Sequence, residues 1–299
     1  MRVSDRQRYD QANFRVDQAK TENSNNLEQL STQKRVTKVS DDPVAVGQIL
    51  RRRSTLSNIE QYSKNVEFTK GYIDRTESSL QGIHDYLIRA KELAVSLSSG
   101  TYAANSRESA GLEVKEILEG VVSLANSQYN NRYVFGGFRT QTPPITGDGE
   151  FSGDDGAIYL PVENGTFRQI NLQARALFEP TADERAKGHF GMVETLALLR
   201  DSLKDNNVQG IRKAMDELDI QMDKTTSSQS SLGAVYNAVD ETSKRLELGN
   251  ELTHADLSRL EDADVYKATT DFKKSEAVLQ STLMASNKLL QPSLLNYLQ

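Results

Sequence analysis

The chain has 299 residues, of which 37% are hydrophobic and 7% aromatic, and it contains neither cysteine nor tryptophan. So little apolar material argues against a compact α/β enzyme, and the absence of cysteine excludes disulfides and thiolate chemistry. A net charge of −6 is unfavourable for a surface that binds phosphates, so we expect no nucleic-acid partner. The longest apolar run is four residues, far below the roughly 20 that cross a bilayer. We therefore expect no membrane partner either.

The N-terminal segment, residues 1–40, predicts one thin amphipathic helix. The positions along one face recur every three or four residues, but several of them hold Ala or Asn instead of a large apolar residue. It has no apolar core before a small-residue cleavage site, so we expect no cleaved signal peptide.

Helix-start signals mark the next boundary. Ser40 offers a capping hydroxyl, Asp41 and Asp42 place carboxylates at the positive end of the helix dipole, and Pro43 suits the first turn. We therefore place a helix start at Ser40 and expect residues 41–137 to form the first arm of a helical rod. Apolar residues at an unbroken spacing of seven, from Ile59 to Ala94, give this arm a seam that faces a partner helix.

The middle of the chain differs in composition. Residues 138–191 hold most of the prolines and are rich in glycine, which indicates turns and short strands. Alternating apolar residues on either side of Asn164 and Gly165 predict a β-hairpin, in which Pro161 favours an edge strand. We expect a small β-rich outer domain inserted into a mainly α protein.

The C-terminal arm, residues 192–260, repeats the four-and-three alternation of apolar positions, so we expect it to return antiparallel along the first arm. Residues 261–299 predict a second thin amphipathic helix. Ordering about 40 residues costs on the order of 40–80 kcal/mol of backbone entropy, whereas each large apolar side chain recovers only about 1.5–3 kcal/mol. We therefore predict that both ends are mobile in the monomer and become ordered on assembly. The predicted assembly interface consists of Tyr9, Val16, Leu30, Phe272, Leu279, Leu283, Leu290 and Leu294.

No group of residues suggests chemistry. Asp41 and Asp42 are consecutive in sequence, so they point about 100° apart and cannot flank one scissile bond. The acidic residues between positions 148 and 155 do not have the spacing of a calcium loop, and the three histidines lie in different parts of the chain. Arg51, Arg52 and Arg53 spread around a helix, which suits ion pairing better than nucleic-acid binding. We expect no catalytic residue, cofactor or metal.

Several strings carry a resemblance. VSDDPVAVGQIL follows the first helix, YVFGG ends the first arm, and SLLNYL closes the chain. With the strings between them they cover about four-fifths of the sequence, and the chain resembles the bacterial flagellin family. One departure is Gln33, where the family commonly has glycine in a turn. Pro43 and the ending at 293–298 resemble the members that join hook to filament more than the filament flagellins, which remain an alternative, as does a non-flagellar coiled-coil secretion or translocator protein.

The resemblance implies a structural, extracellular component of the flagellum that is not an enzyme and is required for filament assembly and motility. It implies a homo-oligomeric ring at the junction, with the first hook-associated protein below and flagellin above. It also implies export by the flagellar type III apparatus and an export chaperone bound to the C-terminal segment.

Overall fold

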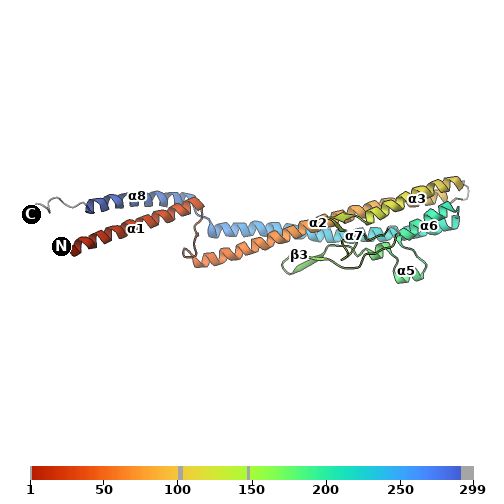
Figure 1. Ribbon diagram of the computed structural model, residues 1–299, viewed down its shortest axis with the longest axis horizontal. Helices are drawn as coiled ribbons and strands as arrows, with labels where there is room; N and C mark the ends of the chain where they lie inside the picture. Colours follow the sequence, from red (N-terminus) through yellow and green to blue (C-terminus); the bar gives the residue numbers. More distant parts are fainter. Residues whose placement is uncertain (1, 100–103, 147–148, 291–299) are drawn as a thin grey trace, which may run out of the picture. The chain divides into compact units, whose positions relative to one another are not determined.

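The structure is a computed structural model that describes residues 2–99, 104–146 and 149–290 (Figure 1). The helices are α1 (Arg2–Thr32), α2 (Pro43–Leu97), α3 (Ala104–Ala125), α4 (Arg175–Phe178), α5 (Ala182–Ala186), α6 (Met192–Lys204), α7 (Val208–Glu261) and α8 (Val265–Leu290). Two antiparallel strand pairs complete the fold: β1 (Gln128–Tyr129) with β2 (Arg132–Tyr133), and β3 (Tyr159–Glu163) with β4 (Thr166–Gln169). The predicted mainly α fold with a small β-rich insertion is confirmed.

The chain forms two compact units, which we describe separately. The terminal unit comprises the described residues of Met1–Asn58 and Gly249–Gln299, and the body unit comprises those of Ile59–Leu248.

In the body unit, α2 and α7 form an antiparallel pair. Three contacts show this: Lys70 Nζ lies 2.7 Å from Asp240 Oδ1, Gln229 Nε2 donates to Gln81 Oε1 at 3.2 Å, and Lys91 pairs with Asp219. Residue numbers therefore rise along α2 as they fall along α7. The residues at the seven-residue spacing are all buried: Ile59, Val66, Ile73, Leu80, Leu87 and Ala94. The predicted antiparallel helical rod is therefore confirmed.

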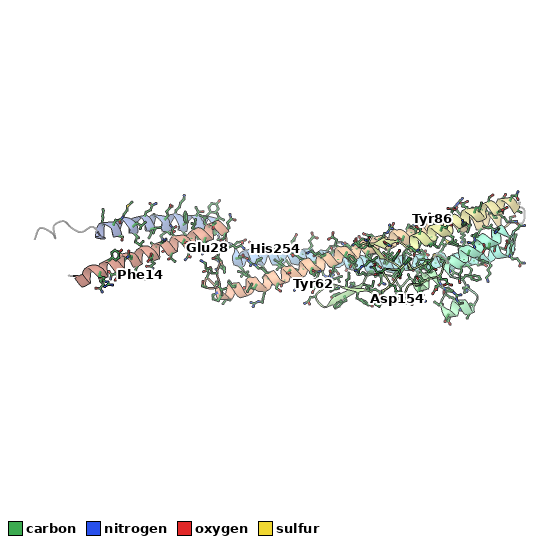
Figure 2. All side chains as sticks on the ribbon, viewed as in Figure 1. Phe14, Glu28, Tyr62, Tyr86, Asp154 and His254 are labelled. Atoms are coloured by element: carbon green, nitrogen blue, oxygen red, sulfur yellow. The ribbon has the colours of Figure 1, made fainter. Side chains whose placement is uncertain are left out.

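Helix α3 turns back along α2. Ser79 Oγ donates to Ser127 Oγ at 2.8 Å, and Arg89 Nε donates to Glu113 Oε1 at 2.7 Å. Gly120 permits this close approach, because a Cβ there would lie 2.7 Å from the ring of Tyr86, which Figure 2 labels on α2.

A buried arginine ties together the far end of the body unit. Arg107 is only 3% exposed, and it donates from Nε to the Leu97 carbonyl at 3.1 Å and from Nη2 to the Ser99 carbonyl at 2.6 Å. Its Nη1 also donates to Asn206 Oδ1, at the turn between α6 and α7. A cation at the C-terminal end of α2 interacts favourably with the helix dipole. Arg107 thus links the ends of three helices.

The predicted hairpin is present as β3 and β4, with Gly165 in the turn at φ 73°. Val162 is completely buried against the α2–α7 pair, and Asn65 Nδ2 donates to the Pro161 carbonyl at 2.7 Å. In this two-stranded sheet the prediction that Pro161 lies on an edge strand holds.

One boundary of the first arm differs from the prediction. Helix α3 ends at Ala125, and residues 128–133 form a hairpin inside the range expected to be helical up to residue 137. The cause is local, because Asn130 and Asn131 both adopt positive φ, 48° and 61°, as a tight two-residue turn requires.

The inserted segment docks on α7 through polar contacts. Glu184 accepts from Lys224 Nζ at 2.8 Å and from the Thr181 backbone N–H at 2.8 Å. These contacts, that with Lys224 foremost, lower the pKa of the Glu184 carboxyl to about 2. The buried carboxylate of Glu217 lies 3.0 Å from His189 Nδ1.

Candidate assembly interface

The terminal helices α1 and α8 lie side by side and run antiparallel (Figure 1). Asn26 Nδ2 approaches the Asp271 carbonyl at 3.4 Å, and Ser275 Oγ approaches Asn23 Oδ1 at 3.4 Å. The buried residues along this pair are small: Ala12, Ala19, Ala268, Ser275 and Ser286. Each contributes little apolar area, so the pair is held by a thin contact.

The segment 33–42 joins α1 to α2, and it begins with a strained residue. Gln33 has φ 56°, a left-handed conformation that costs a residue with a Cβ roughly 1 kcal/mol. The Gln33 carbonyl accepts from the Ala263 N–H at 2.8 Å, and the Arg35 N–H donates to the Glu261 carbonyl at 2.7 Å. A glycine would adopt this conformation without strain.

A buried carboxylate fastens the same segment. The side chain of Glu261 is 5% exposed, accepts from Arg53 Nη2 at 2.6 Å and pairs with Lys34 Nζ. Arg35 Nη2 also donates to the Leu260 carbonyl at 3.0 Å, at the end of α7. Within the terminal unit, this cluster fixes the connection from α1 to the ends of α2 and α7.

The sequence did not reveal the role of Glu261. The only hint in the sequence was the expectation that the arginines at 51–53 form ion pairs. The structure shows two such pairs, Arg53–Glu261 and Arg52–Asp256, the second at 3.2 Å.

The start of α2 differs in detail from the prediction. Pro43 is the first helical residue, and the capping oxygen is Asp42 Oδ1, which accepts from the Ala45 N–H at 2.9 Å. The prediction that the Ser40 hydroxyl provides this cap is wrong, because Ser40 lies in the turn before Asp42. Asp41 instead accepts from the Lys38 and Thr37 backbone N–H groups, which lower the pKa of its carboxyl.

Residues 3–140 match the family model of the bacterial flagellin N-terminal helical region, and residues 215–298 match that of the C-terminal helical region. The chain belongs to the bacterial flagellin family. Both arms are matched, so the interpretation as a non-flagellar translocator is not retained. Members of this family are structural components of the flagellum, outside the cell, and the chain assembles there with other flagellar components.

The chain is similar to two curated flagellar proteins over nearly all of its length. It is 26% identical to flagellar hook-associated protein 3 of Salmonella typhimurium, covering 94% of this chain and 95% of that protein. It is 24% identical to flagellin FlaB1 of Treponema pallidum, covering 85% and 84%. The crystal structure of Bacillus cereus FlgL has the same fold, with a TM-score of 0.61 and 22% identity over 70% of this chain and 99% of that one.

The predicted interface residues of this flagellin-family chain differ in exposure. Tyr9 is 52% exposed and Leu283 44% exposed, whereas Val16, Leu30, Phe272 and Leu279 are half-buried. Leu290 ends α8, and Leu294 lies outside the described residues. Because these four side chains are only half-buried, each leaves apolar surface uncovered.

Other exposed apolar residues were missed by the seven-residue pattern. Phe14 is 70% exposed and points away from α8 (Figure 2), while Tyr266 is 89% and Met284 67% exposed. They fall outside the pattern because they face away from the partner helix. The signal that could have found them was their bulk on otherwise polar faces.

Among residues 2–99, 104–146 and 149–290, no three His, Cys, Asp or Glu side chains are grouped so that they could hold a metal ion. In the same described residues, no helix combines the length and apolar character needed to span a bilayer.

Proposed function

We propose that the chain forms a homo-oligomeric ring at the junction between the flagellar hook and filament. In this ring it meets the first hook-associated protein on one side and flagellin on the other, and it transmits torque between them. The observation that carries the proposal is the α1–α8 pair, which buries mainly Ala and Ser while Tyr9 and Leu283 stay about half exposed. The similarity to hook-associated protein 3 of Salmonella typhimurium supports the choice of the junction.

The physical reason for assembly is the free-energy balance between ordering the terminal helices and burying their apolar side chains. Fixing the backbone of each residue costs about 1–2 kcal/mol, and the small buried residues of the pair return little of it. Neighbouring copies that cover Tyr9, Val16, Phe272, Leu279 and Leu283 add about 1.5–3 kcal/mol for each large side chain fully buried. The terminal helices are therefore mobile in the monomer and ordered in the ring.

The proposal includes export through the flagellar type III apparatus, with a chaperone on residues 261–299 until export. Terminal segments held by such a thin contact suit passage through a narrow channel.

The experiment removes residues 1–30 or residues 270–299 from the chain in its source bacterium. We expect loss of incorporation at the hook tip and loss of swimming, while the purified truncated protein keeps the helical circular dichroism of its body. Because truncation also affects export, Leu283→Gln serves as a second variant, which should reach the medium but not remain on the hook. Normal swimming with either truncated protein would overturn the proposal.

Mobility of the ends has its own measurement. In a dilute monomer, the amides of residues 2–35 should exchange with solvent far faster than those of the buried part of α2. Strong protection of residues 2–35 in the monomer would contradict the assembly-dependent ordering.

Filament flagellin is the second candidate, favoured by the 24% identity to Treponema pallidum FlaB1. The two roles differ in copy number. We expect the chain to be a minor component of sheared flagella, confined to the base of the filament, and finding it as the major component would favour the flagellin role.

A further inference from the structure

The turn between β3 and β4 contains Asn164, the only asparagine of the chain that is followed by glycine. Gly165 adopts φ 73° there. Both residues are exposed, and a Cβ placed on Gly165 would have no heavy atom within 4 Å. The turn is therefore open to water on the outside of the body unit.

Two groups in this turn are free to react with each other. Among the residues that the structure describes, the Asn164 carboxamide makes no hydrogen bond and the Gly165 N–H has no acceptor. Glycine carries no side chain that could shield its amide nitrogen, and its backbone rotates more freely than that of other residues. The Gly165 nitrogen can therefore approach Asn164 Cγ, and closure of a five-membered ring is favoured because the reacting atoms are already joined in one chain.

Asn126, which precedes the small residue Ser127, is held in place by contrast. Its Nδ2 donates to the Ile145 carbonyl at 2.9 Å, and its Oδ1 accepts from the Ile145 N–H at 3.0 Å. The Ser127 N–H donates to the Leu124 carbonyl at 3.1 Å. The carboxamide and the following amide are thus both fixed at Asn126, whereas both are free at Asn164.

We propose that Asn164 is a site of spontaneous deamidation in the folded chain. The Gly165 nitrogen, after losing its proton to a base in the solvent, attacks Asn164 Cγ and forms an N–Cγ bond that closes a succinimide ring. The Cγ–Nδ2 bond breaks, and the leaving nitrogen takes up a proton and departs as ammonia. Water then opens the ring at either carbonyl, which gives aspartate or isoaspartate without any oxidant or reductant. The inference does not depend on the proposed ring.

The position of the turn gives the reaction a structural consequence. Val162, two residues before Asn164, is completely buried against the α2–α7 pair, and Glu163 Oε2 accepts from Arg245 Nη2 at 3.1 Å. Both products add a negative charge next to Glu163, and isoaspartate also lengthens the backbone of the turn by one carbon atom. Because successive side chains of a strand point to opposite faces, a change at the turn disturbs the register that directs Val162 inward. Deamidation should therefore loosen the hairpin from the two helices as the protein ages.

Peptide mass mapping of the full chain tests the site. The purified protein is kept folded at about pH 9, and the conversion of amide to carboxyl is followed at each asparagine. We expect Asn164 to react at least about tenfold faster than Asn126, whose groups are held by hydrogen bonds. In urea, which frees Asn126, the ratio of the two rates should fall by at least about twofold. An Asn164 that stays intact, or equal rates at the two sites in the folded chain, would overturn the proposal.

Hydrogen exchange measures the consequence for the hairpin. The Ile170 N–H donates to the Ile158 carbonyl at 2.9 Å, just beyond the paired strands. It should exchange at least about fivefold faster in aged protein enriched in isoaspartate than in fresh protein. The matched control is Asn164→Ser, which keeps a small polar residue in the turn but has no carboxamide, and its aged form should exchange like the fresh chain. Equal exchange in the fresh and isoaspartate forms, or the same acceleration in aged Asn164→Ser, would overturn the link between deamidation and loosening of the hairpin.

Discussion

The body unit and the terminal unit are both built from long helices, but they bury different side chains. The body has a core of completely buried large residues, including Ile73, Leu80, Leu87, Phe135, Met192 and Leu196. The α1–α8 pair of the terminal unit buries Ala12, Ala19 and Ala268. Helix length is therefore a poor guide to independent stability, because apolar area removed from water decides it. The body therefore has a core of its own, whereas under the proposed function the terminal pair depends on neighbouring copies.

A matched pair of substitutions should give the largest difference between the two units. Leu80→Ala removes a completely buried side chain and should lower the free energy of unfolding by about 2–5 kcal/mol, measured by urea denaturation of the monomer. Leu279→Ala removes a half-buried side chain and should cost the monomer less than about 1 kcal/mol while reducing assembly. Equal losses of stability would break the comparison.

The next effect concerns the buried guanidinium of the body unit. Arg107→Ala should destabilise the body by about 3 kcal/mol, because it removes the hydrogen bonds that the guanidinium donates to the Leu97 and Ser99 carbonyls. Arg107→Lys is the control, and it should recover only part of the loss because an ammonium cannot reach all three acceptors in the geometry of the guanidinium. A change below about 0.5 kcal/mol for Arg107→Ala would show that these contacts do not hold the helix ends.

A smaller effect should appear with pH. Glu184 has a pKa lowered to about 2 in the folded chain, chiefly by Lys224, so its contribution is fully present above about pH 4.5 and is lost as the pH falls toward 2. Its side chain is 28% exposed, so we expect only about 1 kcal/mol.

The measurement compares melting temperatures of the native chain and Glu184→Gln across pH 2–7. The two should differ near neutral pH and converge toward pH 2, while Asp183→Asn, on the exposed side of α5, should follow the native chain. A difference that is constant with pH would contradict the assignment.

The smallest effect should lie in the terminal unit. Gln33→Gly should stabilise the connection by less than about 1 kcal/mol, because glycine adopts the φ of 56° without strain but loses more entropy on folding. The amide of Ala263, which donates to the Gln33 carbonyl, should then exchange more slowly. Gln29→Gly inside α1 is the control and should have the opposite effect, and faster exchange at Ala263 in Gln33→Gly would refute the strain argument.

Much of the fold could be predicted from periodicity. The seven-residue seam from Ile59 to Ala94 identified the buried face of α2, and the turn at Asn164–Gly165 identified the β3–β4 hairpin. The β1–β2 hairpin was missed because its turn uses two asparagines at positive φ, which single-sequence periodicity does not reveal. Of the candidate interface, the sequence predicted the half-buried residues of the α1–α8 pair but missed the outward-facing Phe14 and Met284.

The sequence by itself determined the antiparallel rod, the insertion and the poverty of the ends in large apolar residues, since these follow from composition and local spacing. Only the tertiary structure decided that Arg107 caps α2 and that Glu261 fastens the segment after α1. These features join residues distant in the chain, and the positions of such residues are set by the packing of whole helices, which no local pattern encodes.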